Sequence, residues 1–271
     1  MLSVKYKTIL KVAIPLMAGT FIQSIVSITD AAILSRYSTL SFDASGNAGL
    51  LYITLFMGLT GLGDAAQIVM ARRIGETKNS FINGLLQSSF LINLIFGIAF
   101  FALIFFGAKS LLYSYSSNLA LADEQILYLR TRSFGFFTAA FIVALNGYFM
   151  ALGKTWVILV STAIFAFFNI ILDIFLIFGY GVFPEMGIRG AALATVISEF
   201  VSLLVLVFFL FKSKEFKQFE IFTKIAITKQ SVINIIKVGF PLVIQGFFAL
   251  GTWTLFFTWI EQIGTYELTV S

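Results

Sequence analysis

The chain has 271 residues, of which 59% are hydrophobic and only 11% are charged, against roughly 25% charged in ordinary soluble domains. It contains no His and no Cys, which excludes disulfides, thiol nucleophiles, histidine bases and nearly all transition-metal sites. The net charge of +5 comes from basic residues dispersed between apolar runs, a pattern typical of membrane topology and not of nucleic-acid binding. We therefore expect an all-α polytopic membrane protein that needs no cofactor.

Seven segments are long and apolar enough to cross the hydrocarbon core of a bilayer, which takes about 20 residues of helix. They are residues 11–35, 48–70, 85–107, 133–152, 156–178, 188–211 and 235–260. The chain enters the first span without a signal-peptide cleavage pattern, so this span is expected to be retained. At the far end of the seventh span, Glu261 and Gln262 are expected to mark the return to water.

Most Lys and Arg residues fall on one side of the predicted membrane, before the first span and after the second, fourth and sixth. By the positive-inside rule this side is cytoplasmic, and it carries the N-terminus. Arg130 and Arg132 are assigned to the connection on the outer side. No basic residue is therefore expected deep inside a span.

The first and seventh spans look like two copies of one helix. Residues 10–24 read LKVAIPLMAGTFIQS and residues 236–250 read IKVGFPLVIQGFFAL, and two of the three prolines of the chain fall in register. An even number of spans separates the copies, so both enter from the same side and the repeats are parallel. We expect a six-helix N-terminal lobe at 1–230 and the first helix of an incomplete second lobe at 231–271. We therefore expect the chain to be a truncated form, the product of a disrupted gene, or one half of a two-lobed protein.

Four carboxylates lie inside the apolar spans, where a charge costs a few kcal/mol or more unless it is paired. They are Asp30, Asp64, Asp173 and Glu199. Asp30 lies 19 residues after Lys11, and Asp173 lies 19 residues after Lys154. At about 1.5 Å of rise per residue, both carboxylates stand at the same level, about 28 Å up their helices.

One neutral side chain shares this level and another lies one helical turn deeper. Thr195 lies about as far inward from the outer end of its span as Asp30 does, and Asn169 lies one helical turn before Asp173. If the first, fifth and sixth spans pack together, these four residues form one cluster of oxygen ligands. Such a cluster suits a hard cation such as Na⁺, or a proton shared between two carboxylates. The open alternative is that the residues only pair with one another or cap neighbouring backbone.

Three further residues carry weaker expectations. Pro15 interrupts the hydrogen bonding of the first span and is a candidate gating kink, the alternative being a fixed bend that aids packing. Glu199 is a possible proton relay or a partner for a neighbouring helix, and Asp64 approaches a polar turn, where a structural role is favoured. No phosphate-loop, zinc or Ser-Lys pattern is present, so an enzyme is not expected.

The sequence resembles one family of transporters over essentially its whole length. The motifs that carry the resemblance are ILKVAIPL and SITDAAILSR in the first span, ARRIGE after the second, ALGKT after the fourth, and NIILDIFLIFG followed by GIRGAALATVIS. They are similar to those of the multidrug and toxic compound extrusion (MATE) transporters, in particular the bacterial branch of the DNA-damage-inducible type.

The resemblance implies a two-lobed, twelve-helix exporter that expels cationic, amphipathic compounds in exchange for H⁺ or Na⁺, in the inner membrane of a bacterial cell. It also implies that Asp30, Asn169, Asp173 and Thr195 bind the coupling cation and that Pro15 bends the first span. Two alternatives stay open. One is a lipid-linked saccharide flippase, which would need several basic residues in its cavity, and the other is a non-transporting fragment that lacks its second lobe.

Overall fold

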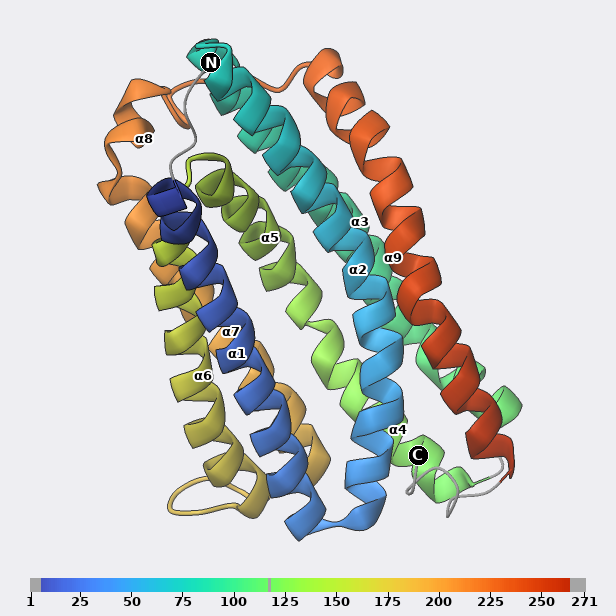
Figure 1. The fold of residues 1–271 in the computed structure, drawn as a ribbon. Coiled ribbons are helices and arrows are strands. Elements are labelled where there is room, and N and C mark those ends of the chain that lie inside the picture. The colour runs from blue at the N-terminus through green and yellow to red at the C-terminus, as the bar shows by residue number, and fades with distance from the viewer. Residues whose placement is uncertain (1–5, 117, 264–271) are drawn as a thin grey trace.

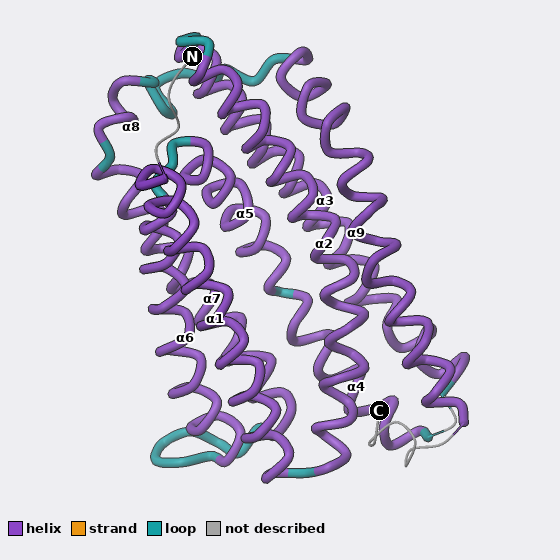
Figure 2. Tube along the Cα trace, in the orientation of Figure 1, coloured by secondary structure: helices purple, strands orange, loops and turns teal. Residues whose placement is uncertain are grey.

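The computed structural model describes residues 6–116 and 118–263, which form helices and turns and contain no strand (Figures 1 and 2). The helices are α1 (Tyr6–Tyr37), α2 (Thr39–Gly75), α3 (Ile82–Tyr115), α4 (Leu119–Ser133), α5 (Gly135–Ala151), α6 (Thr155–Phe178), α7 (Gly187–Lys212), α8 (Lys214–Gln218) and α9 (Lys229–Ile263), with a 3-10 turn at Asn79–Phe81. The fold class expected from the sequence is confirmed.

Within residues 6–116 and 118–263, six helices are each long and apolar enough to span a membrane, namely α1, α2, α3, α6, α7 and α9. Helices α4 and α5 pass the same test only as a pair, bent by 48° at Phe134, and counting this pair as one span gives seven among the described residues. The expected fourth span, 133–152, therefore covers only its second half. The first half is α4, whose N-terminus is capped by the Asn118 side chain accepting from the backbone N–H groups of Ala120 and Leu121.

The helices form two groups with α5 between them (Figure 1). Helix α6 packs against both α1 and α7, and α2 packs along α9. Helix α5 contacts α2, α3 and α7, so it joins the two groups through the middle of the bundle. This arrangement brings α1, α6 and α7 together, which is the condition for the predicted oxygen cluster.

The contact between α2 and α9 is close because glycines line it. A Cβ atom added at Gly61 would lie 2.9 Å from the backbone nitrogen of Val243 in α9. Further along the same contact the hydroxyls of Thr54 and Thr254 are hydrogen-bonded at 2.7 Å. Small residues and interhelical hydrogen bonds are the usual basis of helix association in a membrane. The division of the chain into two lobes at residue 230 stays a prediction.

The expectation that Glu261 marks the return to water is wrong, although its neighbour Gln262 is exposed. The side chain is 2% exposed and accepts hydrogen bonds from Asn47, from the Ser116 hydroxyl at 2.7 Å and from Gln125 at 3.2 Å. The donors come from α2, α4 and the connection between α3 and α4. A carboxylate with three donors can stay buried, so Glu261 fastens the end of α9 to the rest of the bundle.

The opposite end of the bundle carries a basic turn after α2. Glu76 is ion-paired with Arg72, Arg73 and Lys78 at 3.0, 3.0 and 3.2 Å. The hydrogen bonds from Arg72 and then from Lys78 lower the pKa of Glu76 to about 2. One carboxylate thus faces three cations, which leaves this end of α2 positively charged.

Candidate functional site: an oxygen cluster between three helices

Four polar residues meet where α1, α6 and α7 pack together. The carboxyl groups of Asp30 on α1 and Asp173 on α6 lie near enough to each other to interact electrostatically. One turn earlier on α6, the Asn169 amide donates to the Thr195 hydroxyl on α7 at 3.4 Å, and that hydroxyl donates to the carbonyl of Ala191 at 2.9 Å. Asn169 and Asp173 have no exposed surface.

The cluster contains buried oxygen atoms with no hydrogen-bond donor among the described residues. They are Oδ1 of Asp30, Oδ1 of Asn169 and both Oδ1 and Oδ2 of Asp173. A buried polar atom without a partner costs on the order of 1–3 kcal/mol, so four in one place call for an explanation. Carboxylate and amide oxygens are the ligands of hard cations, and two adjacent carboxylates can also hold a proton. The donor set therefore fits Na⁺ or H⁺.

The close approach of α6 and α7 depends on small residues on α7. A Cβ atom added at Gly190 would lie 2.5 Å from the carbonyl oxygen of Leu176 on α6. Two more small residues of α7 are buried here, Ala191 directly after Gly190 and Ala194 one turn further along. This contact lets the hydroxyl of Thr195 reach the amide of Asn169.

A buried ion pair lies next to the oxygen cluster. Arg132, near the end of α4, forms two hydrogen bonds with Glu199 on α7, from Nη1 to Oε2 at 3.0 Å and from Nη2 to Oε1 at 2.5 Å. Its guanidinium lies 4.1 Å from the ring centre of Tyr52, and Thr138 donates to Glu199 Oε2 at 3.2 Å. Arg132 is also near enough to Asp30 for an electrostatic interaction.

The expectation that no basic residue lies deep in a span is wrong for Arg132, which is 8% exposed. The sequence places it in a connection, but α4 is helical and carries it inward. Gly135 makes room for it, because a Cβ atom at that position would lie 2.1 Å from Arg132 Nη1. The charge of Arg132 is neutralised by Glu199, so it is not free to bind a pyrophosphate. Glu199 is a partner for a neighbouring helix, and a relay role for it stays a prediction.

The remaining candidates lie away from the oxygen cluster. Asp64 is an exposed side chain on α2. Pro15 lies inside the unbroken α1, one turn from Val12, whose carbonyl accepts a hydrogen bond of 2.9 Å from the hydroxyl of Thr155 on α6. The segment around Pro15 is therefore tied to the start of α6. A gating role for Pro15 stays a prediction.

A cavity of about 350 Å³ opens beside the ion pair. Its polar lining consists of Gln23, Thr60, Asn146, Ser161, Thr162, Glu199 and Ser202, and its apolar lining of Phe56, Met57, Ala139, Ile142, Val143 and Phe165. The side-chain oxygen of Asn146 is buried and has no donor in the described part of the chain. A concave site that combines apolar and aromatic side chains with polar groups can hold an organic ligand.

Residues 15–175 match the model of the MatE family, which is more than half of the chain. The chain belongs to the MatE family. The resemblance to MATE transporters noted from the sequence motifs is thereby confirmed, as is the expectation that the chain is not an enzyme, since the members of this family are multi-pass membrane transporters.

Relatives of this MatE chain include two curated bacterial proteins named probable multidrug resistance protein NorM. The one from Thermotoga maritima is 29% identical over 247 residues, which cover 89% of this chain and 52% of the relative. The one from Agrobacterium fabrum is 26% identical over 270 residues, or 97% of this chain and 57% of the relative. The chain thus spans about half the length of these relatives.

Solved structures agree on the fold of this MatE chain. An outward-facing multidrug resistance MATE family transporter of the MOP superfamily superposes with a TM-score of 0.77 at 25% identity, over 89% of this chain and 52% of that one. An inward-facing conformation of such a transporter superposes with a TM-score of 0.80 at 22% identity, over 97% of this chain and 59% of that one. Both matches again cover little more than half of the longer protein.

Proposed function

We propose that the protein exports organic compounds, mainly cationic and amphipathic ones, in exchange for H⁺ or Na⁺ by alternating access. The observation that carries this proposal is the group of four unpartnered oxygens on Asp30, Asn169 and Asp173. Buried carboxylates are retained in a membrane when they serve a pathway or a coupling ion. The names of the curated relatives, which are multidrug resistance proteins, support the same proposal.

In this mechanism Asp30 and Asp173 hold the coupling cation, while Asn169 and Thr195 supply neutral oxygens. The cluster binds a cation on one side of the membrane and releases it on the other when the helices that carry it rearrange. Because the cluster joins α1, α6 and α7, binding changes the electrostatic repulsion between Asp30 and Asp173 and so changes how tightly the three helices pack. Pro15 gives α1 the capacity to bend in response.

The cavity beside Glu199 is the proposed site for the exported compound. Phe56 and Phe165 offer apolar and aromatic contact, and Asn146 offers an unpartnered oxygen to a ligand N–H group. The remaining proposals are a bacterial inner membrane location, a cytoplasmic N-terminus, and a second lobe that completes the transport pathway. That lobe is either the continuation of this chain or a separate chain.

Transport in liposomes tests the proposal. The protein, with its second lobe if one continues the chain, is reconstituted and given a pH or Na⁺ gradient, and uptake of a fluorescent cationic dye is followed. Asp173→Asn should abolish gradient-driven uptake, while the matched control Asp64→Asn should retain it, because Asp64 lies outside the cluster. Wild-type rates in Asp173→Asn would refute the coupling role.

A further inference from the structure

One charged side chain lines the cavity that is proposed to hold the exported compound. Among the described residues of its wall only Glu199 on α7 is ionisable, and the wall also contains the rings of Phe56 on α2 and Phe165 on α6. Arg132, which is bound to Glu199, does not line the cavity. Glu199 therefore joins the cavity to Arg132.

The carboxylate of Glu199 can accept one more hydrogen bond. Its Oε2 accepts two, from Nη1 of Arg132 at 3.0 Å and from the Thr138 hydroxyl at 3.2 Å, and its Oε1 accepts one, from Nη2 of Arg132 at 2.5 Å. Each carboxylate oxygen can accept two. In the described part of the chain nothing else donates to Oε1, so one acceptor position is left. A positively charged N–H group is the donor that bonds a carboxylate most strongly.

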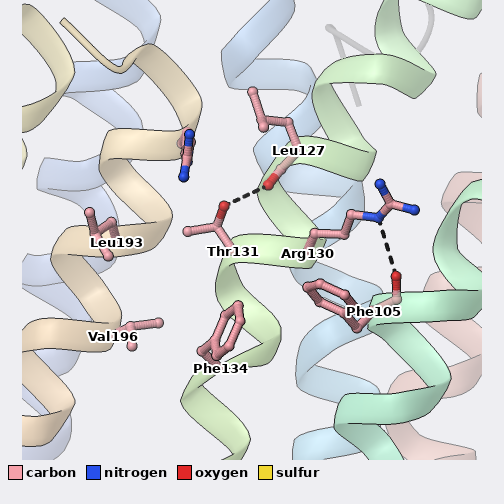
Figure 3. Close-up of a pocket in the computed structure, with 8 residues that line it drawn as sticks. Phe105, Leu127, Arg130, Thr131, Phe134, Leu193 and Val196 are labelled. Atoms are coloured by element: carbon pink, nitrogen blue, oxygen red, sulfur yellow. Dashed lines mark hydrogen bonds between the residues drawn. The ribbon is translucent and has the colours of Figure 1, made fainter. Parts of the chain in front are cut away.

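Of the two arginines of α4, only Arg132 faces Glu199. Arg130 turns towards α3, where its Nε donates to the backbone carbonyl of Phe105 at 3.2 Å (Figure 3). The two directions differ because side chains two positions apart do not share a helix face. One guanidinium of α4 thus competes with any other cation for Glu199, and the neighbouring one does not.

This arrangement, taken with the proposed export function on which the inference rests, suits one class of cation. We propose that Glu199 anchors the exported compound through a positively charged N–H group, and that Arg132 is a positioning residue that orients the carboxylate and limits how tightly the compound binds. The fixed charge of Arg132 repels a cation at Glu199, so the compound can leave again. The substrate class is an aromatic compound with a protonated amino or amidinium group, whose rings contact Phe56 and Phe165.

Two flat cations built on the same ring system test this assignment on the protein purified in a neutral detergent. Protonated 9-aminoacridine carries N–H donors, whereas 10-methylacridinium carries the same charge and no N–H group. Fluorescence titration should show that the wild-type chain binds 9-aminoacridine about tenfold more tightly, a factor that corresponds to one charge-assisted hydrogen bond.

Four variants separate the role of the charge from that of the fold. Arg132→Met removes the competing charge and should raise the affinity for 9-aminoacridine about tenfold, whereas Arg132→Lys keeps the charge and should bind as the wild type does. The matched control Arg130→Met removes a guanidinium that faces α3 and should leave the affinity unchanged. The double variant Arg132→Met, Glu199→Gln should lose both the gain in affinity and the preference for 9-aminoacridine.

The double variant contains no orphaned charge, so it keeps the test decisive even where a single variant is unstable. Equal binding of the two cations by the wild type, a preference that survives in the double variant, or equal affinities of Arg132→Met and Arg132→Lys overturns the inference. None of these results contradicts export itself, which the liposome assay measures separately. If the wild type binds neither cation, the inference fails together with the proposed site for the exported compound.

Discussion

Breaking the ion pair between Arg132 and Glu199 should destabilise the bundle more than any change at an exposed charge. The two side chains are only 9% and 13% exposed and share two hydrogen bonds of 3.0 and 2.5 Å. Removing one partner of a buried pair leaves the other charge uncompensated, which costs about 3–5 kcal/mol. Arg132→Met also removes the contact with the ring of Tyr52, which adds up to about 2 kcal/mol.

The double variant Arg132→Met, Glu199→Gln separates the cost of an orphaned charge from the value of the pair itself. With both charges removed, no unpaired ion is left in the membrane interior, and a buried pair replaced by neutral side chains is often nearly neutral in stability. We therefore expect the double variant to be more stable than either single variant. Reversible unfolding in mixed micelles of sodium dodecyl sulfate and a mild detergent gives the free energy of unfolding for each protein.

A more exposed ion pair in the same chain serves as the control. Lys154 and Glu215 join α6 to α8 with side chains that are 31% and 23% exposed. Partial burial raises the pKa of Glu215, but the hydrogen bond from Lys154, a backbone hydrogen bond and the charges of Lys154 and Lys214 together lower this pKa below its usual value. Glu215→Gln should cost no more than about 1 kcal/mol. The reasoning about the buried pair is refuted if Arg132→Met lowers the free energy of unfolding as little as Glu215→Gln does. It is also refuted if the double variant is less stable than both Arg132→Met and Glu199→Gln.

Three other predictions follow from the packing and the topology. Gly190→Ala should lower the free energy of unfolding by about 1–3 kcal/mol, because its Cβ would press on the carbonyl oxygen of Leu176, and an unchanged value in the same unfolding assay would contradict the close contact. Glu261→Ala should lower the free energy of unfolding by at least about 3 kcal/mol, because a charge-assisted hydrogen bond contributes about 1.5–3 kcal/mol and three are lost. A decrease below about 1 kcal/mol would mean that the carboxylate does not hold α9 in place. A cysteine at Val182, 94% exposed, should react with an impermeant reagent in intact cells while one at Ile225, 90% exposed, should not, and the reverse pattern would overturn the proposed orientation.

The membrane spans could be predicted from the sequence because an apolar run of this length is rarely found outside a membrane-spanning helix. The exception is α4, which contains Asp123, Glu124, Arg130 and Arg132 and therefore reads as a polar connection. It is a helix because its charged residues have partners elsewhere in the bundle, such as Glu199 for Arg132 and the Ser41 hydroxyl for Glu124. Those partners are far away in the chain, so no local pattern reveals them.

Counting residues along helices predicts the height of a side chain but not the direction it faces. The count puts Asp30, Asp173 and Thr195 at one level, and the structure adds that α6 lies between α1 and α7, which turns a common height into contact. The same count gives no hint of Arg132 or Glu261. Arg132 lies just before the point where the chain bends by 48° between α4 and α5. The residues that donate hydrogen bonds to Glu261 lie at least 136 positions away in the chain. Short hydrogen bonds between distant segments are the part of the site that the sequence cannot show.

Cation binding by the purified chain tests the central claim most directly. Proton uptake is measured by titration between pH 5 and pH 9, and heat release is measured on adding Na⁺ at fixed pH, for the wild-type chain and for Asp173→Asn. If the four unpartnered oxygens form the coupling site, the wild-type chain binds one cation, H⁺ or Na⁺, that Asp173→Asn does not bind, and Asp64→Asn behaves as the wild type. Identical titrations for the wild-type chain and Asp173→Asn would contradict the account.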